Sequence, residues 1–178
     1  MVYPGLNRPG SIEPAEALAG ERIRLRLQQP ADDAALNRIR AEPEVLRWWG
    51  PPDEPDGESV IYVVEQDGRV IGSIQYYEQK DVGYASAGID VYLERSVHGQ
   101  GLGTDAVRTL AAHLVRDRGH HRLTIDPSVG NAPAIACYER VGFRPVGVMR
   151  SYERVWWEDG RYRDGLLMDL LAEDLTEL

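Results

Sequence analysis

The stretch SVHGQGLGTDAV constrains this chain most, because three glycines occupy alternate positions just before an amphipathic segment. From about Thr104 onward, apolar residues recur at helical spacing on one stripe: Val107, Leu110, Ala111, Leu114 and Val115. The N-terminus of a helix has unsatisfied N–H groups and a partial positive charge, and glycines leave these groups uncovered. Neither the Walker sequence nor the Rossmann spacing is present. The pattern therefore predicts a seat for a phosphate or pyrophosphate, although a tight glycine turn without a ligand fits the same residues.

The length of 178 residues predicts one folded domain, with 43% hydrophobic and 28% charged residues. Prolines and glycines interrupt residues 1–20, so we expect a flexible N-terminal extension there and a single domain over 21–178. The single cysteine, Cys137, excludes an internal disulfide and favours a reducing compartment. No apolar run is long enough for a membrane helix, and no signal-peptide pattern is present. We therefore expect a cytoplasmic protein that does not bind membranes, as a monomer or a homodimer.

The charge balance bears on the class of ligand. The chain has 29 acidic and 20 basic residues, a formal net charge of -9. Binding to nucleic acid depends on Lys and Arg side chains that neutralise phosphates, so this balance disfavours it. An acidic protein attracts cationic small molecules, although the same charge also serves solubility alone.

The hydrophobic patterns predict alternating strands and helices. The predicted strands are 22–27, a hairpin over 59–79 that turns at Asp67-Gly68, 85–93, 122–126, and a closing hairpin over 143–171. The predicted helices are 30–41, a short one over 43–50, one that starts near Thr104, and one that Asn131 caps and Gly142 ends. This order predicts an α/β (α+β) fold with a mixed, mostly antiparallel sheet of about seven strands and helices on both faces.

The segments GIDVYL, HGQGLGTDAVRTL and TIDPSVGNAPAIACYERVGF resemble the GNAT superfamily of acetyl-CoA-dependent N-acyltransferases. The resemblance extends from Arg22 to Leu170. It implies a splayed central strand pair that binds the pantetheine arm, and a glycine loop that holds the pyrophosphate. The family usually has Gln or Arg where this chain has His98.

The resemblance implies a set of residues that bind acetyl-CoA. Asn131, Ala134 and Tyr138 match the family's N-x-x-A-x-x-x-Y helix, which packs beside the CoA sulfur. The full expected set is Val91, Tyr92, Leu93, His98, Gly99, Gln100, Gly101, Leu102, Gly103, Thr104, Asn131, Ala134 and Tyr138.

Two residues are candidates for the proton transfers. N-acetylation needs a neutral amine, and a carboxylate within reach can remove its proton. If Ile89 faces the core, Asp90 faces the opposite side of its strand, where it is either this base or a solvated residue. Tyr138 has a hydroxyl that can protonate a departing thiolate, although its helical position also suits a core residue.

Further details resemble the aminoglycoside 6′-N-acetyltransferases, namely RWWG before an acidic loop and the DPS stretch. In that subfamily the aspartate matching Asp126 holds the aminoglycoside, and an indole from Trp48 or Trp49 lies against the sugar rings. The expected acceptor-binding residues are Trp48, Trp49, Asp90, Asp126, Glu158 and Asp164. Because Asp126 also suits a turn and both tryptophans also suit a core, these assignments compete with structural roles.

Cys137 is not required as a nucleophile, because direct transfer is the expected mechanism. The histidines have no partners at metal-ligand spacing, so no metal site is expected.

Three hypotheses about function follow. The first is transfer of acetyl from acetyl-CoA to the 6′-amine of an aminoglycoside, as in antibiotic resistance. The second is acetylation of a protein N-terminus or a small amine metabolite, since ERIRLRLQQPADDAALNRI also resembles the opening of ribosomal-protein N-acetyltransferases. The third is an acyl-CoA sensor without catalysis. A peptide acceptor needs an open groove, whereas an aminoglycoside needs a pocket walled with acids.

Overall fold

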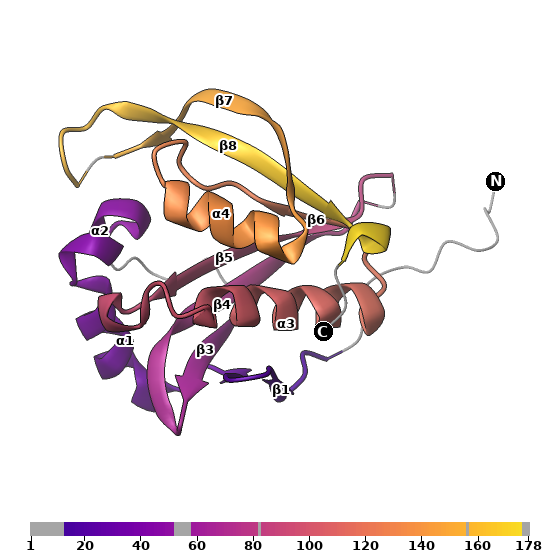
Figure 1. Ribbon diagram of the computed structural model, residues 1–178, viewed down its shortest axis with the longest axis horizontal. Coiled ribbons are helices and arrows are strands. Elements are labelled where there is room, and N and C mark those ends of the chain that lie inside the picture. The colour runs from indigo at the N-terminus through magenta and orange to yellow at the C-terminus, as the bar shows by residue number, and fades with distance from the viewer. Residues whose placement is uncertain (1–12, 52–57, 82, 156, 176–178) are drawn as a thin grey trace.

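The computed structural model describes residues 13–51, 58–81, 83–155 and 157–175, and shows one twisted sheet with helices on both faces (Figure 1). The eight strands are β1 (Ala17–Ala19), β2 (Arg24–Leu27), β3 (Val60–Gln66), β4 (Arg69–Gln79), β5 (Ser86–Leu93), β6 (Arg122–Ile125), β7 (Arg144–Arg154) and β8 (Tyr162–Leu171). The α-helices are α1 (Asp33–Arg40), α2 (Pro43–Trp49), α3 (Leu102–Arg116) and α4 (Ala132–Val141). Short 3-10 turns lie at Pro30–Asp32, Arg95–Val97 and Ala172–Asp174.

The sheet has the order β1-β2-β3-β4-β5-β6-β8-β7. All neighbouring strands are antiparallel except β5 and β6, which are parallel. The predicted fold class is therefore confirmed, with one strand more than the expected number of about seven. None of the helices in the described part of the chain is long and apolar enough to cross a membrane.

The additional strand, β1, lies in the segment 1–20 that the sequence analysis assigned to an extension. Residues 1–12 lie outside the described residues. Ala17–Ala19, in contrast, pair with β2, because Leu18 lies opposite Leu25 and packs against the main core. The sheet therefore starts before the boundary predicted at residue 20.

Local sequence signals place several elements where they were expected. Asp67 and Gly68 have φ values of 51° and 76°, as the turn between β3 and β4 requires. The Asn131 side chain accepts a hydrogen bond from the Ala134 N–H at the start of α4, and Gly142 (φ 119°) ends this helix. Helix α3 begins at Leu102, two residues earlier than expected, because its N-cap is Gly101.

The two faces of the sheet carry separate clusters of buried residues. Ile89 and Leu93 belong to the main core with α3 and α4. Tyr92 belongs to a smaller cluster with Leu36 and Ile39 of α1. Because side chains alternate along a strand, Asp90 lies on the same face as Tyr92, opposite Ile89. The helices α3 and α4 therefore cover one face of the sheet, and α1 and α2 cover part of the other.

Strands β5 and β6 separate after a short contact. They pair only at Ala87–Leu123 and Gly88–Thr124. Beyond Thr124 the β6 side stays with β8: the Leu166 N–H donates to the Pro127 carbonyl, and the Val129 N–H donates to the Asp164 carbonyl. The rest of β5 has no strand on this side among the described residues. The predicted splayed strand pair is therefore confirmed.

Candidate active site

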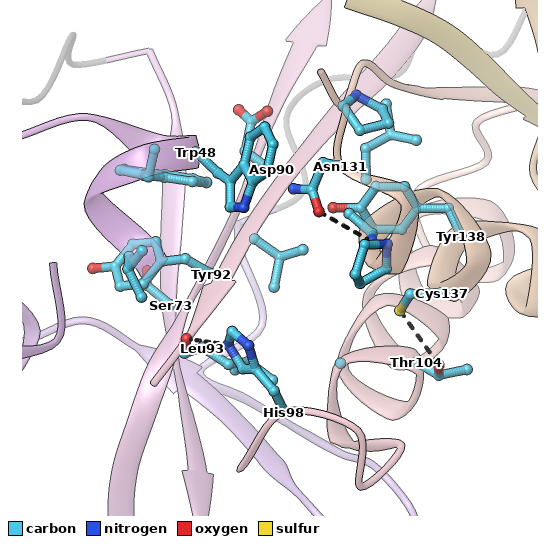
Figure 2. A pocket seen from close by; sticks show the side chains of 18 of the residues that line it. Trp48, Ser73, Asp90, Tyr92, Leu93, His98, Thr104, Asn131, Cys137 and Tyr138 are labelled. Carbon is cyan, nitrogen blue, oxygen red and sulfur yellow. Dashed lines mark hydrogen bonds between the residues drawn. The ribbon is translucent and has the colours of Figure 1, made fainter. Parts of the chain in front are cut away.

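A cavity of about 1590 Å³ lies at the split between β5 and β6 and reaches both faces of the sheet. Its walls include Val91, Leu93 and Cys137 from the side of α3 and α4. They also include Asp90 and Trp48 from the side of α1 and α2. Figure 2 shows Trp48 and Cys137 on either side of β5. The split therefore joins two chambers that the sheet would otherwise separate.

The glycine loop forms one end of the cavity. Gly99 (φ 75°) and Gly101 (φ 83°) have left-handed backbones, and space is open where a side chain would begin. The first amide of α3 that bonds to the loop is that of Asp105, which donates to the Gly101 carbonyl. Within the described residues, the N–H groups of 99–104 have no acceptor. This row of free donors at a helix N-terminus suits an anion.

Most of the residues expected to bind acetyl-CoA line the cavity: Val91, Tyr92, Leu93, His98, Gly99, Gly101, Gly103, Thr104, Asn131, Ala134 and Tyr138. The side chains of Gln100 and Leu102 do not. The amide of Gln100 folds back to the Ser96 carbonyl, and Leu102 is fully buried in the core.

His98, the departure from the family pattern, stabilises the loop. Its Nε2 lies 2.9 Å from the Leu93 carbonyl oxygen, so the ring joins the end of β5 to the glycine loop (Figure 2). The ring also lines the cavity.

Arginines near the glycine loop are functional candidates that the sequence analysis missed. Arg22 Nη1 donates to the Gln100 carbonyl at 2.7 Å, and Arg108 Nη2 donates to the Arg140 carbonyl at 3.3 Å. All three arginines line the cavity. They come from three distant parts of the chain, so no local motif could have grouped them. Glu21 and Asp105 also line this part of the cavity, and the Asp105 carboxylate accepts the backbone N–H groups of Glu21 and Arg22.

Two carboxylates define the opposite end. The last paired residues of β5 and β6 are Gly88 and Thr124, and Asp90 and Asp126 lie two residues beyond them. Asp90 Oδ2 accepts a hydrogen bond from Gln75 Nε2 at 3.1 Å. Both carboxylates line the cavity, so the split has one acidic residue on each of its two strands.

Asp126 is a partly buried acid with a tyrosine partner. Burial raises its pKa above the ordinary 3.8. The Tyr152 hydroxyl donates to Asp126 Oδ2 at 2.9 Å and lowers this pKa, while the nearby charge of Glu153 raises it. Tyr152 is a second residue that the sequence analysis missed, because it lies on β7, 26 positions further along the chain.

Tyr138 projects from α4 toward the split (Figure 2). Its side chain is buried, and burial raises the pKa of its hydroxyl far above the ordinary 10.0. Nearby Cys137, Asp90 and Asp126 raise it further. No hydrogen-bond partner of this hydroxyl occurs among the described residues. Tyr138 is therefore a neutral donor with its proton available.

Asn131 positions this tyrosine. Its side chain accepts the Ala134 N–H at 3.3 Å and so caps the helix from which Tyr138 projects. The spacing of the three residues is thus first a helix-capping pattern, and all three also line the cavity.

The paired tryptophans have different surroundings. The Trp49 ring packs edge-on against Tyr92, with 4.7 Å between ring centroids. The Trp48 ring lies beside the loop after β6, since a side chain at Gly130 would start 3.5 Å from it. Arg163 approaches the Trp48 ring to 5.5 Å. Both tryptophans line the cavity, and Trp48 is the one that faces the loop of Asp126.

Two expected acceptor residues lie elsewhere. Glu158 is exposed in the turn between β7 and β8 and does not line the cavity. Asp164 uses its Oδ1 to accept the Ser151 N–H at 2.7 Å and thereby holds an irregularity in β7. We therefore correct the expectation and leave both out of the acceptor site. Residues 52–57 of the acidic loop lie outside the described residues.

Cys137 also lines the cavity, with its Sγ 3.3 Å from Thr104 Oγ1. Burial raises the pKa of this thiol, which keeps it protonated. In the described part of the chain, no three His, Cys, Asp or Glu side chains are grouped to hold a metal ion.

Comparisons with known proteins agree with this geometry. The Acetyltransferase (GNAT) family model matches residues 25–143. The aminoglycoside N(6′)-acetyltransferase type 1 of Klebsiella pneumoniae is 30% identical over 161 residues, which cover 75% of this chain and 79% of that protein. The chain therefore belongs to the GNAT acetyltransferase family.

Two solved structures place the chain within that fold. Mycobacterium smegmatis RimJ in complex with CoA-disulfide has a TM-score of 0.79 and 26% identity, with 90% of each chain covered. AAC(6′)-Ib in complex with paromomycin and acetyl-CoA has a TM-score of 0.72 and 26% identity, covering 89% of this chain and 99% of that one.

We predict that Asp126 titrates above the ordinary value for an aspartate, and that Tyr152→Phe raises its pKa further. Burial acts against the charged form, and the substitution removes a donor that favours it. Titration of the carboxyl carbons by ¹³C NMR measures both values. Tyr162→Phe, on the neighbouring strand, is the matched control and should leave Asp126 unchanged. An equal or lower pKa in Tyr152→Phe would contradict the assignment.

Proposed function

We propose that this protein transfers the acetyl group of acetyl-CoA to an amine of a polycationic acceptor, and that the 6′-amine of an aminoglycoside is the acceptor. The observation that carries the proposal is the polarity of the cavity. Free amides and Arg22 line the cavity at the glycine loop, whereas Asp90, Asp126 and Tyr138 line it at the split between β5 and β6.

The glycine-loop end fits the pyrophosphate of acetyl-CoA. The free amides of residues 99–104 and the arginines around them are donors suited to phosphate oxygens. The open space beside Gly99 and Gly101 lets such a group approach the backbone closely. The unpaired side of β5 offers hydrogen-bonding groups to the amides of the pantetheine arm. When bound, acetyl-CoA supplies the activated acetyl group as a thioester.

The carboxylate end supplies the proton transfers. An ammonium group must lose a proton before its nitrogen can attack the thioester carbonyl. Asp90 accepts this proton, directly or through a water molecule. The C–N bond forms, the C–S bond breaks, and Tyr138 donates its proton to the departing sulfur. The second proton lost by the nitrogen then restores the Tyr138 hydroxyl through a water molecule. Tyr138 is protonated at neutral pH, as its ordinary pKa of 10.0 already ensures, and burial keeps it neutral by raising this pKa further.

The acceptor class follows from charge and shape. Asp90 and Asp126 attract cationic groups, and the Trp48 ring offers an apolar surface to a sugar ring. The net charge of -9 favours the approach of a polycation. The similarity to an aminoglycoside N(6′)-acetyltransferase supports the same acceptor. The second candidate is a protein N-terminus or a small amine metabolite, which the resemblance of residues 21–39 favours.

The first prediction concerns the acceptor. Release of CoA thiol from acetyl-CoA should be fast with kanamycin or neomycin, which have a 6′-amine. It should be lost with the 6′-hydroxyl counterpart of neomycin, because a hydroxyl does not provide the amine nucleophile. An N-terminal peptide and a simple monoamine are the comparison acceptors. Turnover on the peptide alone would establish the second candidate and overturn the aminoglycoside.

The next prediction concerns Asp90. We expect Asp90→Asn to lower kcat by about 10²–10⁴-fold at neutral pH, because the amide cannot accept the proton. The affinity for CoA, measured by calorimetry, should not change. Asp67→Asn is the control, since Asp67 lies in the β3–β4 turn and asparagine accepts its left-handed backbone. Full activity of Asp90→Asn would remove this residue from the mechanism.

The glycine loop generates a third prediction. Gly101→Ala should weaken CoA binding about tenfold or more, because a methyl group would enter space that the loop leaves open to the ligand. Gly68→Ala is a matched control, since Gly68 has a similar φ of 76° and equally open surroundings, but lies in the β3–β4 turn. Both variants should lose similar stability, measured by thermal unfolding. Equal CoA affinities in the two variants would contradict the loop's role.

A further inference from the structure

We propose that Tyr77 and Tyr152 complete a subsite around Asp126 for a second cationic group of the acceptor. The inference rests on the proposed function and adds to it the residues that select polycations. It starts from the different roles of the Asp90 and Asp126 carboxylates. One base suffices for the transferred amine, and Asp90 lies on β5 for that purpose. Asp126 lies across the split, directly after the end of β6.

Each tyrosine lies across a glycine of the neighbouring strand. A side chain at Gly88 of β5 would start 2.1 Å from the Tyr77 ring. A side chain at Gly165 of β8 would start 2.8 Å from the Tyr152 ring. Because both glycines lack a side chain, the two rings extend over the sheet from opposite sides toward β6. The Tyr77 hydroxyl bonds to Thr124, and the Tyr152 hydroxyl bonds to Asp126.

A local irregularity in β7 directs Tyr152. The pairing of β7 with β8 shifts between Met149 and Glu153, and Ser151 has a φ of 50°. Asp164 accepts the Ser151 N–H and holds this geometry. Asp164, which the sequence analysis assigned to the acceptor, therefore acts indirectly. It holds Ser151 and so sets the direction of Tyr152, the residue after Ser151.

The charge of Asp126 is left for a ligand. Tyr152 occupies Oδ2, and the other oxygen has no hydrogen bond among the described residues. No cationic side chain of the described chain pairs with this carboxylate, although it is partly buried. The two tyrosines remain partly open, with 41% of Tyr77 and 51% of Tyr152 exposed. The free carboxylate oxygen of Asp126, which lines the cavity with Tyr152, can bind an ammonium group through its charge.

The occupant is a second primary ammonium group on the acceptor that presents its other amine to Asp90. A monocation needs only the transfer position, whereas a dication also uses Asp126. The subsite should therefore lower KM for dications and leave kcat nearly unchanged, because the second charge stays distant from the reacting bond. Tyr152 is a positioning residue in this scheme, since it acts by orienting Asp126.

The test compares a monoamine and a diamine built on one aminocyclitol skeleton, with Tyr152→Phe and Asp126→Asn. In the unmodified protein the diamine should have the higher kcat/KM. Tyr152→Phe should raise KM for the diamine about tenfold, with kcat and the monoamine KM unchanged. Asp126→Asn should abolish the preference. Tyr162→Phe, also a tyrosine on this hairpin but without a hydrogen bond in the described chain, is the control and should behave as the unmodified protein.

Equal losses for both acceptors would show a general structural effect and overturn the subsite, while leaving the proposed function intact. An unchanged preference in Asp126→Asn would overturn it as well. Calorimetric binding of the diamine to the CoA-bound protein gives a readout without turnover. If the unmodified protein neither binds nor acetylates either amine, the proposed function and the subsite both fail.

Discussion

The early end of the pairing between β5 and β6 determines the rest of this structure. The chain from Arg122 to Val129 follows β8 by continuous hydrogen bonds, whereas β5 receives only two residue pairs. The N–H and C=O groups of a strand point alternately to its two sides, so β6 pairs with β5 on one side and with β8 on the other. Beyond Thr124 only the hydrogen bonds on the β8 side continue. Among the described residues, the part of β5 after Gly88 has no strand on its β6 side. A passage therefore opens through the centre of the sheet. An intact sheet would separate its two faces completely.

The passage connects a part of the cavity that favours anions with a part that favours cations. The N-terminus of α3 and the arginines beside it favour anions, and they lie on the face covered by α3 and α4. Asp90 and Asp126 favour cations and border the split. Each ligand is therefore attracted to its own end, and only the reacting atoms meet in the passage. Tyr138 lies there as a neutral, buried donor, because either charge at that position would be costly to bury.

The parts that could be predicted from the sequence are those specified by adjacent residues. The Asp67-Gly68 turn, the Asn131 cap and the glycine loop each need only a few neighbouring residues, and their backbones are as expected. The arginines at the loop and the pair of Tyr152 with Asp126 join distant parts of the chain, so no local pattern contains them. Asp164 shows the opposite error. Its place in the closing hairpin suggested a role at the acceptor, whereas its carboxylate accepts the backbone N–H of Ser151.

Strand register links the stability of the fold to the geometry of the site. On β5, pairing with β4 places Gln75 opposite Asp90 and turns Ile89 into the core. A shift by one residue would bury the carboxylate and expose the isoleucine, which the core strongly opposes. On β6, the pairing of Ile125 with Met168, both buried, fixes the direction of Asp126 in the same way. Asp90 and Asp126 each lie two residues beyond the last pair of β5 and β6. Both carboxylates border the split because the apolar residues next to them must be buried. The burial of the core thus fixes the acidic end of the cavity without any direct contact between the two carboxylates.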